Sequence, residues 1–205
     1  MRDFFRLKER LDWKIAVLTI VSTIVIIIER YNQLTAWETL DRLLLYFILP
    51  MAITLLIFRE NPRNYGFQIG DWRAGLLLTA GSIILITPIL YYLARMDPSM
   101  KGYYDWQLKF LPWQTMIELF AWEYLFRGWL LFGYARKFGP EAIWLQAVPF
   151  ALAHIGKPEI ETLSTIFGGF VFGWIAYKTK SFLYPFMIHF FVSAFTIIAA
   201  AGLLG

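Results

Sequence analysis

Long apolar stretches constrain this chain more than any other feature of its sequence. Several of them reach the roughly 20 residues that a helix needs to cross a ~30 Å hydrocarbon core, where the backbone must satisfy its own hydrogen bonds. We therefore expect an all-α fold, a polytopic transmembrane helical bundle of about seven spans, with eight as the alternative. The seven lie at about residues 13–29, 40–58, 74–94, 113–135, 141–155, 162–178 and 181–203. The fifth is short and contains Pro149, which favours a tilted, broken or partly immersed helix.

The composition agrees with a membrane protein and gives no sign of a soluble domain. The chain is 59% hydrophobic and 19% aromatic, and no long polar linker divides it, so we expect one membrane-embedded domain over residues 1–205. The net charge of +4 needs no nucleic-acid partner, because the basic residues lie at the ends of the apolar stretches. The absence of cysteine excludes disulfides and thiolate chemistry. The expected partner is the membrane lipid itself.

Basic residues fall in alternate connections between the apolar stretches. They are Arg2, Arg6, Lys8, Arg10 and Lys14 at the N-terminus, then Arg59, Arg63 and Arg73, then Arg136 and Lys137, then Lys178 and Lys180. With seven spans all four groups lie on one side, and the positive-inside rule places that side in the cytoplasm. We expect an integral protein of the inner or plasma membrane with a cytoplasmic N-terminus, its first span retained as a signal anchor.

The fourth stretch carries ionisable residues within the apolar sequence. Glu123 and Arg127 are four residues apart, so on a helix they share a face and can pair. Such residues are costly inside a bilayer and usually mark a protein interior or a functional cavity. A pair that only locks helix packing is the simpler alternative. Glu118, near the outer end of the stretch, is a second carboxylate that needs water, a proton or another partner.

The two histidines of the chain also lie in apolar stretches. His154 ends the run Phe150 to His154, and His189 opens the run His189 to Ser193. A single histidine on an apolar face is most often a core residue, but two on separate segments weaken that interpretation. Two histidines and a glutamate resemble a zinc ligand set, yet no His-x-x-x-His pair is present. We expect neither a metal nor a cofactor.

Small residues indicate where the segments approach one another. Thr165, Gly169 and Gly173 recur every four residues, as do Ala147 and Ala151. Such ridges let helices pack closely in membranes. We expect this packing to bring Glu123 and the two histidines within reach of one another.

Three motifs in this order resemble the CAAX protease and bacteriocin-processing (CPBP) family, which includes the type II CAAX prenyl endopeptidases. They are Glu123-x-x-x-Arg127-Gly128, Phe150-x-x-x-His154 and His189-x-x-x-Ser193. The resemblance extends over about residues 60–195, with the motif core in 118–193. It implies a glutamic intramembrane protease of the bacterial type.

The chain differs from the family pattern at two positions. The first motif usually begins with paired glutamates, and Trp122 occupies the leading one; the third usually ends in Asn or Asp, where Ser193 stands. In the family, the first glutamate and first histidine are thought to activate a water, and the last two residues to stabilise the oxyanion. The resemblance therefore implies water activation at His154 and oxyanion stabilisation by His189, with the Ser193 hydroxyl as a second donor. Glu118 and Glu123 compete for the role of base.

The expected function is an endopeptidase that hydrolyses a peptide bond of a membrane-embedded or lipid-anchored protein or peptide, using water activated by a glutamate. Arg127 would hold Glu123 charged and fixed. Ser193 is not expected to be a serine nucleophile, because no nucleophile elbow or orienting Asp accompanies it. The alternatives are an inactive relative that serves as a membrane scaffold or chaperone, which Trp122 favours, and a small transporter.

Overall fold

The computed structural model describes residues 11–204, and these residues form helices and turns with no β-strand. The basic residues Arg2, Arg6, Lys8 and Arg10 lie outside this range. The all-α bundle expected from the apolar stretches is confirmed.

Seven long helical segments correspond to the seven expected spans. They are α1 (Trp13–Tyr31); a continuous segment of α2 (Glu38–Leu43), η1 (Leu44–Ile48), α3 (Leu49–Ala52) and η2 (Ile53–Ile57); α4 (Trp72–Met96); a continuous segment of α6 (Trp113–Glu123), η5 (Tyr124–Leu130) and α7 (Leu131–Phe138); α8 (Ala142–Leu152); α9 (Glu159–Thr179); and α10 (Leu183–Ala200). The shorter helices are η3 (Pro62–Tyr65), α5 (Pro98–Tyr104), η4 (Asp105–Phe110) and η6 (Gly139–Glu141). Three of the segments, η1, η2 and η5, are π-helical.

Four helices are long and apolar enough to cross a membrane: Glu38–Ile57, Trp72–Met96, Glu159–Thr179 and Leu183–Ala200. The segment α6–η5–α7 is not among them and carries Glu118, Glu123 and Arg127. The helix α8 has 11 residues, about 16 Å at 1.5 Å per residue, and by itself does not cross a ~30 Å core. The protein is therefore an integral membrane protein, and the count of seven spans stays a prediction.

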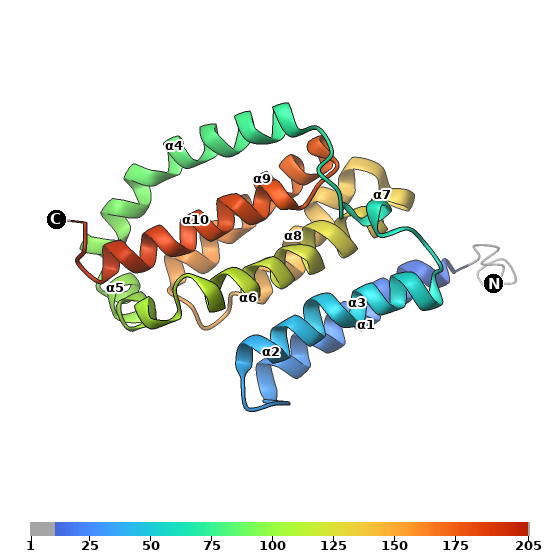
Figure 1. Ribbon diagram of the computed structural model, residues 1–205, viewed down its shortest axis with the longest axis horizontal. Coiled ribbons are helices and arrows are strands. Elements are labelled where there is room, and N and C mark those ends of the chain that lie inside the picture. The colour runs from blue at the N-terminus through green and yellow to red at the C-terminus, as the bar shows by residue number, and fades with distance from the viewer. Residues whose placement is uncertain (1–10, 205) are drawn as a thin grey trace, which may run out of the picture.

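The helices lie side by side in the bundle (Figure 1). α4 packs outermost against α10, α10 packs against α6, and α8 pairs with α9. The hairpin of α1 and α2–η2 flanks this group, with α2 against α6 and α1 against η5 and α7. The polar connection after α4 is itself helical, because Asp97 caps the first turn of α5 through the backbone N–H groups of Ser99 and Met100.

The basic connections meet at one end of the bundle. Lys14 and Arg136 both pair with Glu60, with a Lys14 Nζ–Glu60 Oε1 distance of 2.6 Å. The turn between α9 and α10 lies against the same connection, because the backbone N–H of Asp71 donates to the carbonyl of Thr179 at 2.9 Å. The predicted grouping of these connections is therefore present, whereas the side of the membrane that they face stays a prediction.

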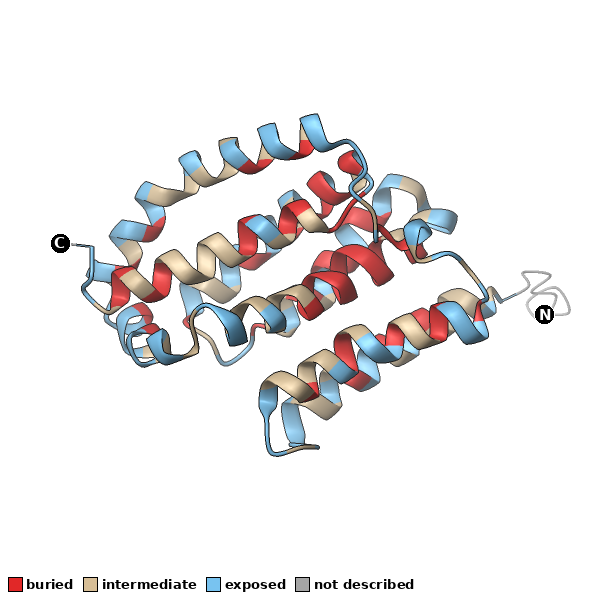
Figure 2. Ribbon diagram, in the orientation of Figure 1, coloured by how far each residue is buried: buried red, intermediate tan, exposed pale blue. Residues whose placement is uncertain are grey.

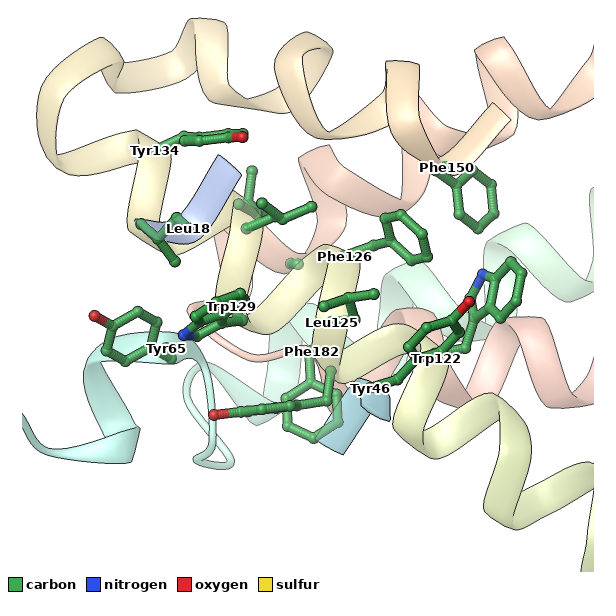
Figure 3. Close-up of a cluster of buried hydrophobic side chains, with 14 of the residues drawn as sticks. Leu18, Tyr46, Tyr65, Trp122, Leu125, Phe126, Trp129, Tyr134, Phe150 and Phe182 are labelled. Carbon is green, nitrogen blue, oxygen red and sulfur yellow. The ribbon is translucent and has the colours of Figure 1, made fainter. Parts of the chain in front are cut away.

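The core of the bundle surrounds η5, all seven residues of which are buried (Figure 2). Its aromatic side chains pack among residues from α1, η1, η3 and α8. Figure 3 shows Phe126 and Trp129 of η5 in this cluster, together with Phe150 of α8. The outward faces are apolar, and Leu77, Ile84 and Leu85 on α4 are each more than 70% exposed. Such a surface suits contact with lipid tails.

Candidate active site

Glu123, Arg127 and His189 form one buried cluster at the centre of the molecule. Glu123 Oε1 accepts a hydrogen bond from Arg127 Nη1 at 3.0 Å and lies 2.6 Å from His189 Nδ1. Both members of the ion pair are completely buried. The predicted pairing of Glu123 with Arg127 is present, and the same oxygen also binds the second histidine.

Aromatic rings enclose the guanidinium of Arg127. Its Cζ lies 3.7 Å from the centre of the Phe150 ring and 5.2 Å from that of Phe172. Charges removed from water are costly unless they are paired, and an aromatic face supplies additional attraction to a cation. Since Glu123 is the only carboxylate that pairs with Arg127 within residues 11–204, the two depend on each other.

His154 lies just past the end of α8, in the turn that leads to α9. Its Nδ1 lies 2.7 Å from the carbonyl oxygen of Phe150, one turn earlier. A carbonyl only accepts hydrogen bonds, so Nδ1 carries the proton and Nε2 of the neutral ring bears a lone pair. The hydroxyl of Thr162, at the start of α9, donates to the carbonyl of His154 at 2.9 Å. The contact with Phe150 fixes the orientation of the imidazole, and the contact with Thr162 holds the backbone of the turn.

The two histidines come from separate helical segments but share one neighbourhood. Their ring centres are 6.5 Å apart and the rings are nearly parallel, at 22°. The ring of Phe150 packs against both, at 4.4 Å from His154 and 6.0 Å from His189. The structure thus brings together Glu123 and the two histidines, as expected.

The small residues of α9 account for this convergence. Thr165, Gly169 and Gly173 are all buried. A Cβ on Gly169 would lie 3.1 Å from Ala147 Cβ and equally close to the Phe150 ring. The Gln146 amide of α8 donates to the carbonyl of Gly169 at 2.8 Å, which ties the two helices further. The close approach predicted from the small-residue ridge is present.

A cavity of about 360 Å³ opens beside the histidines. It lies between the α1–α2 hairpin, the α5–η4 segment, α6, the turn after α8, and α10. Its lining includes five residues around the sequence motifs: Glu118, Trp122, His154, His189 and Ser193. Glu123 and Arg127 do not line it, so they reach the cavity only through His189.

Trp122 forms part of the wall between the cavity and the core. Its side chain is buried and packs edge-on against His154, with ring centres 5.5 Å apart and an angle of 88°. It also contacts Tyr46 and Phe126. An apolar ring therefore faces His154 from the position where the family pattern has a carboxylate.

Glu118 lines the same cavity but is engaged with the flanking hairpin. Its two oxygens accept from Thr39 Oγ1, at 2.5 Å, and from Arg42 Nη1. Arg42 also binds Glu29 at 2.8 Å and Glu38. Sequence reasoning missed Thr39 and Arg42, which are more than 70 positions from Glu118. The signal available was the set of charged residues around the first connection, which the predicted seven-span topology places at the same end of the bundle as Glu118.

Ser193 lies one turn beyond His189 on α10 and lines the cavity beside it. Residues 11–204 contain no group of three or more His, Cys, Asp or Glu side chains arranged for a metal ion. Lys157, next to His154 in the same turn, also lines the cavity and pairs with Glu161 at 3.0 Å.

The comparisons with known proteins agree with the motifs. Residues 104–195, which include every motif residue of the site, match the family described as type II CAAX prenyl endopeptidase Rce1-like. No curated protein and no solved structure matches the chain. The resemblance drawn from the three motifs is confirmed: over residues 104–195 the chain is similar to the Rce1-like type II CAAX prenyl endopeptidases.

Proposed function

We propose that this protein is an intramembrane endopeptidase that hydrolyses a peptide bond of a membrane-embedded or lipid-anchored protein or peptide. The observation that carries the proposal is the meeting of both histidines at one cavity, with His189 held from behind by the buried pair of Glu123 and Arg127. The match of residues 104–195 to a protease family supports the same reaction class. The cavity lies among the helices of the bundle.

The geometry suits attack by water on a peptide carbonyl. His154 has its Nδ1 anchored by Phe150, so its other nitrogen is free to contact the water. Glu123 accepts from His189 Nδ1–H, so His189 can donate to the developing oxyanion through Nε2–H only in its doubly protonated form, whose charge Glu123 would balance; the Ser193 hydroxyl is a second donor. Glu123 and Arg127 act as positioning residues. Glu118 is the carboxylate that borders this space.

Trp122 favours one rival function, an inactive relative that serves as a membrane scaffold or chaperone. Its apolar ring stands where family members carry the first glutamate of their motif. A scaffold would keep the fold and the cavity but would need neither histidine for its action. Cleavage that depends on the histidines therefore distinguishes the two functions.

Newly formed protein N-termini in membranes give a test that works for any protein substrate. Cells expressing the wild-type protein, His154→Ala or His189→Ala would be compared by mass spectrometry of these N-termini. Val148→Ala, on the lipid-exposed side of α8, is the matched control. New N-termini are expected with the wild type and with the control, and with neither histidine variant. The four proteins must be present at equal abundance and have equal thermal stability in detergent. Identical patterns in all four would refute the enzyme and favour the scaffold.

The family name suggests one defined substrate for a second assay: a farnesylated peptide with a C-terminal Cys-aliphatic-aliphatic-X sequence, presented in liposomes with the purified protein. Its cleavage would narrow the substrate class. Cleavage of other membrane peptides alone would retain the protease and reject the prenyl specificity.

We also propose that the end of the bundle that gathers the basic connections faces the cytoplasm in the inner or plasma membrane. The chain has no cysteine, so single-cysteine labelling has no background. Arg63→Cys and Lys101→Cys place a thiol in opposite connections. A membrane-impermeant maleimide should label Lys101→Cys in intact cells and Arg63→Cys only after permeabilisation. The reverse pattern would invert the orientation.

A further inference from the structure

His154 presents an unbonded imidazole nitrogen on a ring that is fixed from behind. Its Nδ1–H is held by the Phe150 carbonyl, and the ring is wedged between Phe150 and Trp122. Its Nε2 has no hydrogen-bond partner within residues 11–204, and it is not among the buried unpaired atoms. Because His154 lines the cavity and Nε2 is neither bonded nor fully buried, a water in the cavity can reach this lone pair.

Neither carboxylate of the motif helix is placed to do the same work. Glu123 does not line the cavity, and the oxygen nearest the site is shared by Arg127 and His189. Its other oxygen, Oε2, is buried without a partner among residues 11–204. Glu123 therefore lies behind His189 and does not border the cavity.

Glu118 borders the cavity but carries a cation on one oxygen and a hydroxyl donor on the other. Both oxygens of Glu118 are therefore already occupied by donors from the hairpin. The hydrogen bonds also aim both oxygens at α2, on the side of the hairpin. This arrangement suits a group that closes the hairpin onto α6 rather than one that takes a proton.

We propose that His154, rather than a glutamate, is the general base of this protein. The inference rests on the proposed protease function. Trp122 stands in place of the family's first glutamate, which leaves His154 as the basic group beside the attacking water.

The proton transfers balance with His154 as the sole shuttle. Its Nε2 takes a proton from water as the water oxygen bonds to the peptide carbon, and the carbonyl electron pair moves onto oxygen. The Nε2–H of a doubly protonated His189 donates a hydrogen bond to that oxyanion. When the oxyanion collapses, the C–N bond breaks and the leaving nitrogen takes the proton from His154 Nε2–H, which restores the neutral ring and gives an acid and an amine.

Chemical rescue tests this assignment. Isolated membranes containing the wild type, His154→Ala or Glu118→Gln would be incubated with imidazole or substituted imidazoles of graded basicity. The rate of appearance of the wild-type N-termini is the readout. General-base catalysis contributes about 10²–10⁴ in rate, so His154→Ala should lose about that factor and regain part of it with imidazole, more with the more basic imidazoles. Glu118→Gln should lose less than about tenfold, short of the range for a general base, and show no rescue.

The outcomes separate the two proposals. A wild type that yields no new N-termini overturns the protease and this inference together. In a second outcome, Glu118→Gln lowers the rate of cleavage by about 100-fold or more, and the rate of His154→Ala does not depend on the basicity of the imidazole. This result retains the protease and assigns the base to Glu118. His154→Ala that is rescued equally by every imidazole overturns the base and leaves His154 a positioning residue.

Discussion

His189 Nδ1 and Arg127 Nη1 bind the same oxygen of Glu123, at 2.6 Å and 3.0 Å. One carboxylate thus joins a cation that has no other acidic partner among residues 11–204 to a histidine at the cavity. A substitution of Glu123 therefore breaks the ion pair with Arg127 and, at the same time, releases His189 from its orientation.

Removing the charge of Glu123 should destabilise the fold as well as the site. Glu123→Gln leaves Arg127 buried and uncompensated, and breaking a buried pair from one side typically costs about 3–5 kcal/mol. Arg127→Met should cost a similar amount. The double variant should be less destabilised than the sum of the two, as thermal unfolding in detergent would measure. Additive losses would show that the pair contributes nothing through its interaction.

Two glycines on α9 form a matched pair for testing the helix packing that positions His154. A Cβ on Gly173 would lie 2.4 Å from Gln146 Nε2, whereas a Cβ on Gly168 would meet nothing within 4 Å. Gly173→Ala must displace the amide that bonds α8 to α9, so it should lower both the melting temperature and the rate of cleavage. Gly168→Ala should leave cleavage intact and raise stability by up to about 1 kcal/mol through helix propensity. Equal behaviour of the two variants would contradict the role of this contact.

The apolar pattern was sufficient to locate the helices. The predicted spans at 74–94 and 162–178 lie inside α4 (Trp72–Met96) and α9 (Glu159–Thr179). The pattern was less informative at α8, where the helix stops at Leu152 and leaves His154 in a turn. Helix ends depend on caps and tertiary contacts, which a run of apolar residues does not encode.

The sequence could not choose between Glu118 and Glu123, and the structure shows why. Both residues lie in α6, about 140° apart on an ideal helical wheel, so the sequence separates their faces but does not show which face borders a cavity. The partner of Glu118, Arg42, lies on another helix. Only the assembled bundle decides which carboxylate borders the cavity.

Glu60 should make the stability of the protein depend on pH. It lies in the connection between η2 and α4 and is bound by Lys14, Tyr65 and Arg136. Burial alone would raise its pKa, but these hydrogen bonds outweigh burial and lower the pKa from 4.5 to about 2. A depressed folded-state pKa adds stability above the unfolded value of about 4.5 that is lost as the pH falls toward about 2.

Glu60→Gln should therefore flatten the decline in melting temperature between about pH 5 and about pH 2 and should lower the melting temperature at neutral pH. Glu141→Gln is the matched control, since Glu141 forms no ion pair within the described part of the chain. A Glu60→Gln protein with the same pH profile as the wild type would contradict the interaction.

Gly156, two residues after His154, should be intolerant of any side chain. Its φ of +100° is a conformation that other residues rarely adopt, and a Cβ there would lie 2.2 Å from Arg30 Nη2. Gly156→Ala combines backbone strain of about 1–3 kcal/mol with displacement of Arg30 from the rim of the cavity. Adding Arg30→Ala removes the clash but not the strain, so the double variant should recover only part of the lost cleavage. Gly102→Ala, where a Cβ meets nothing within 4 Å, should cleave normally. If Gly156→Ala cleaves at the wild-type rate, the turn after α8 does not position His154.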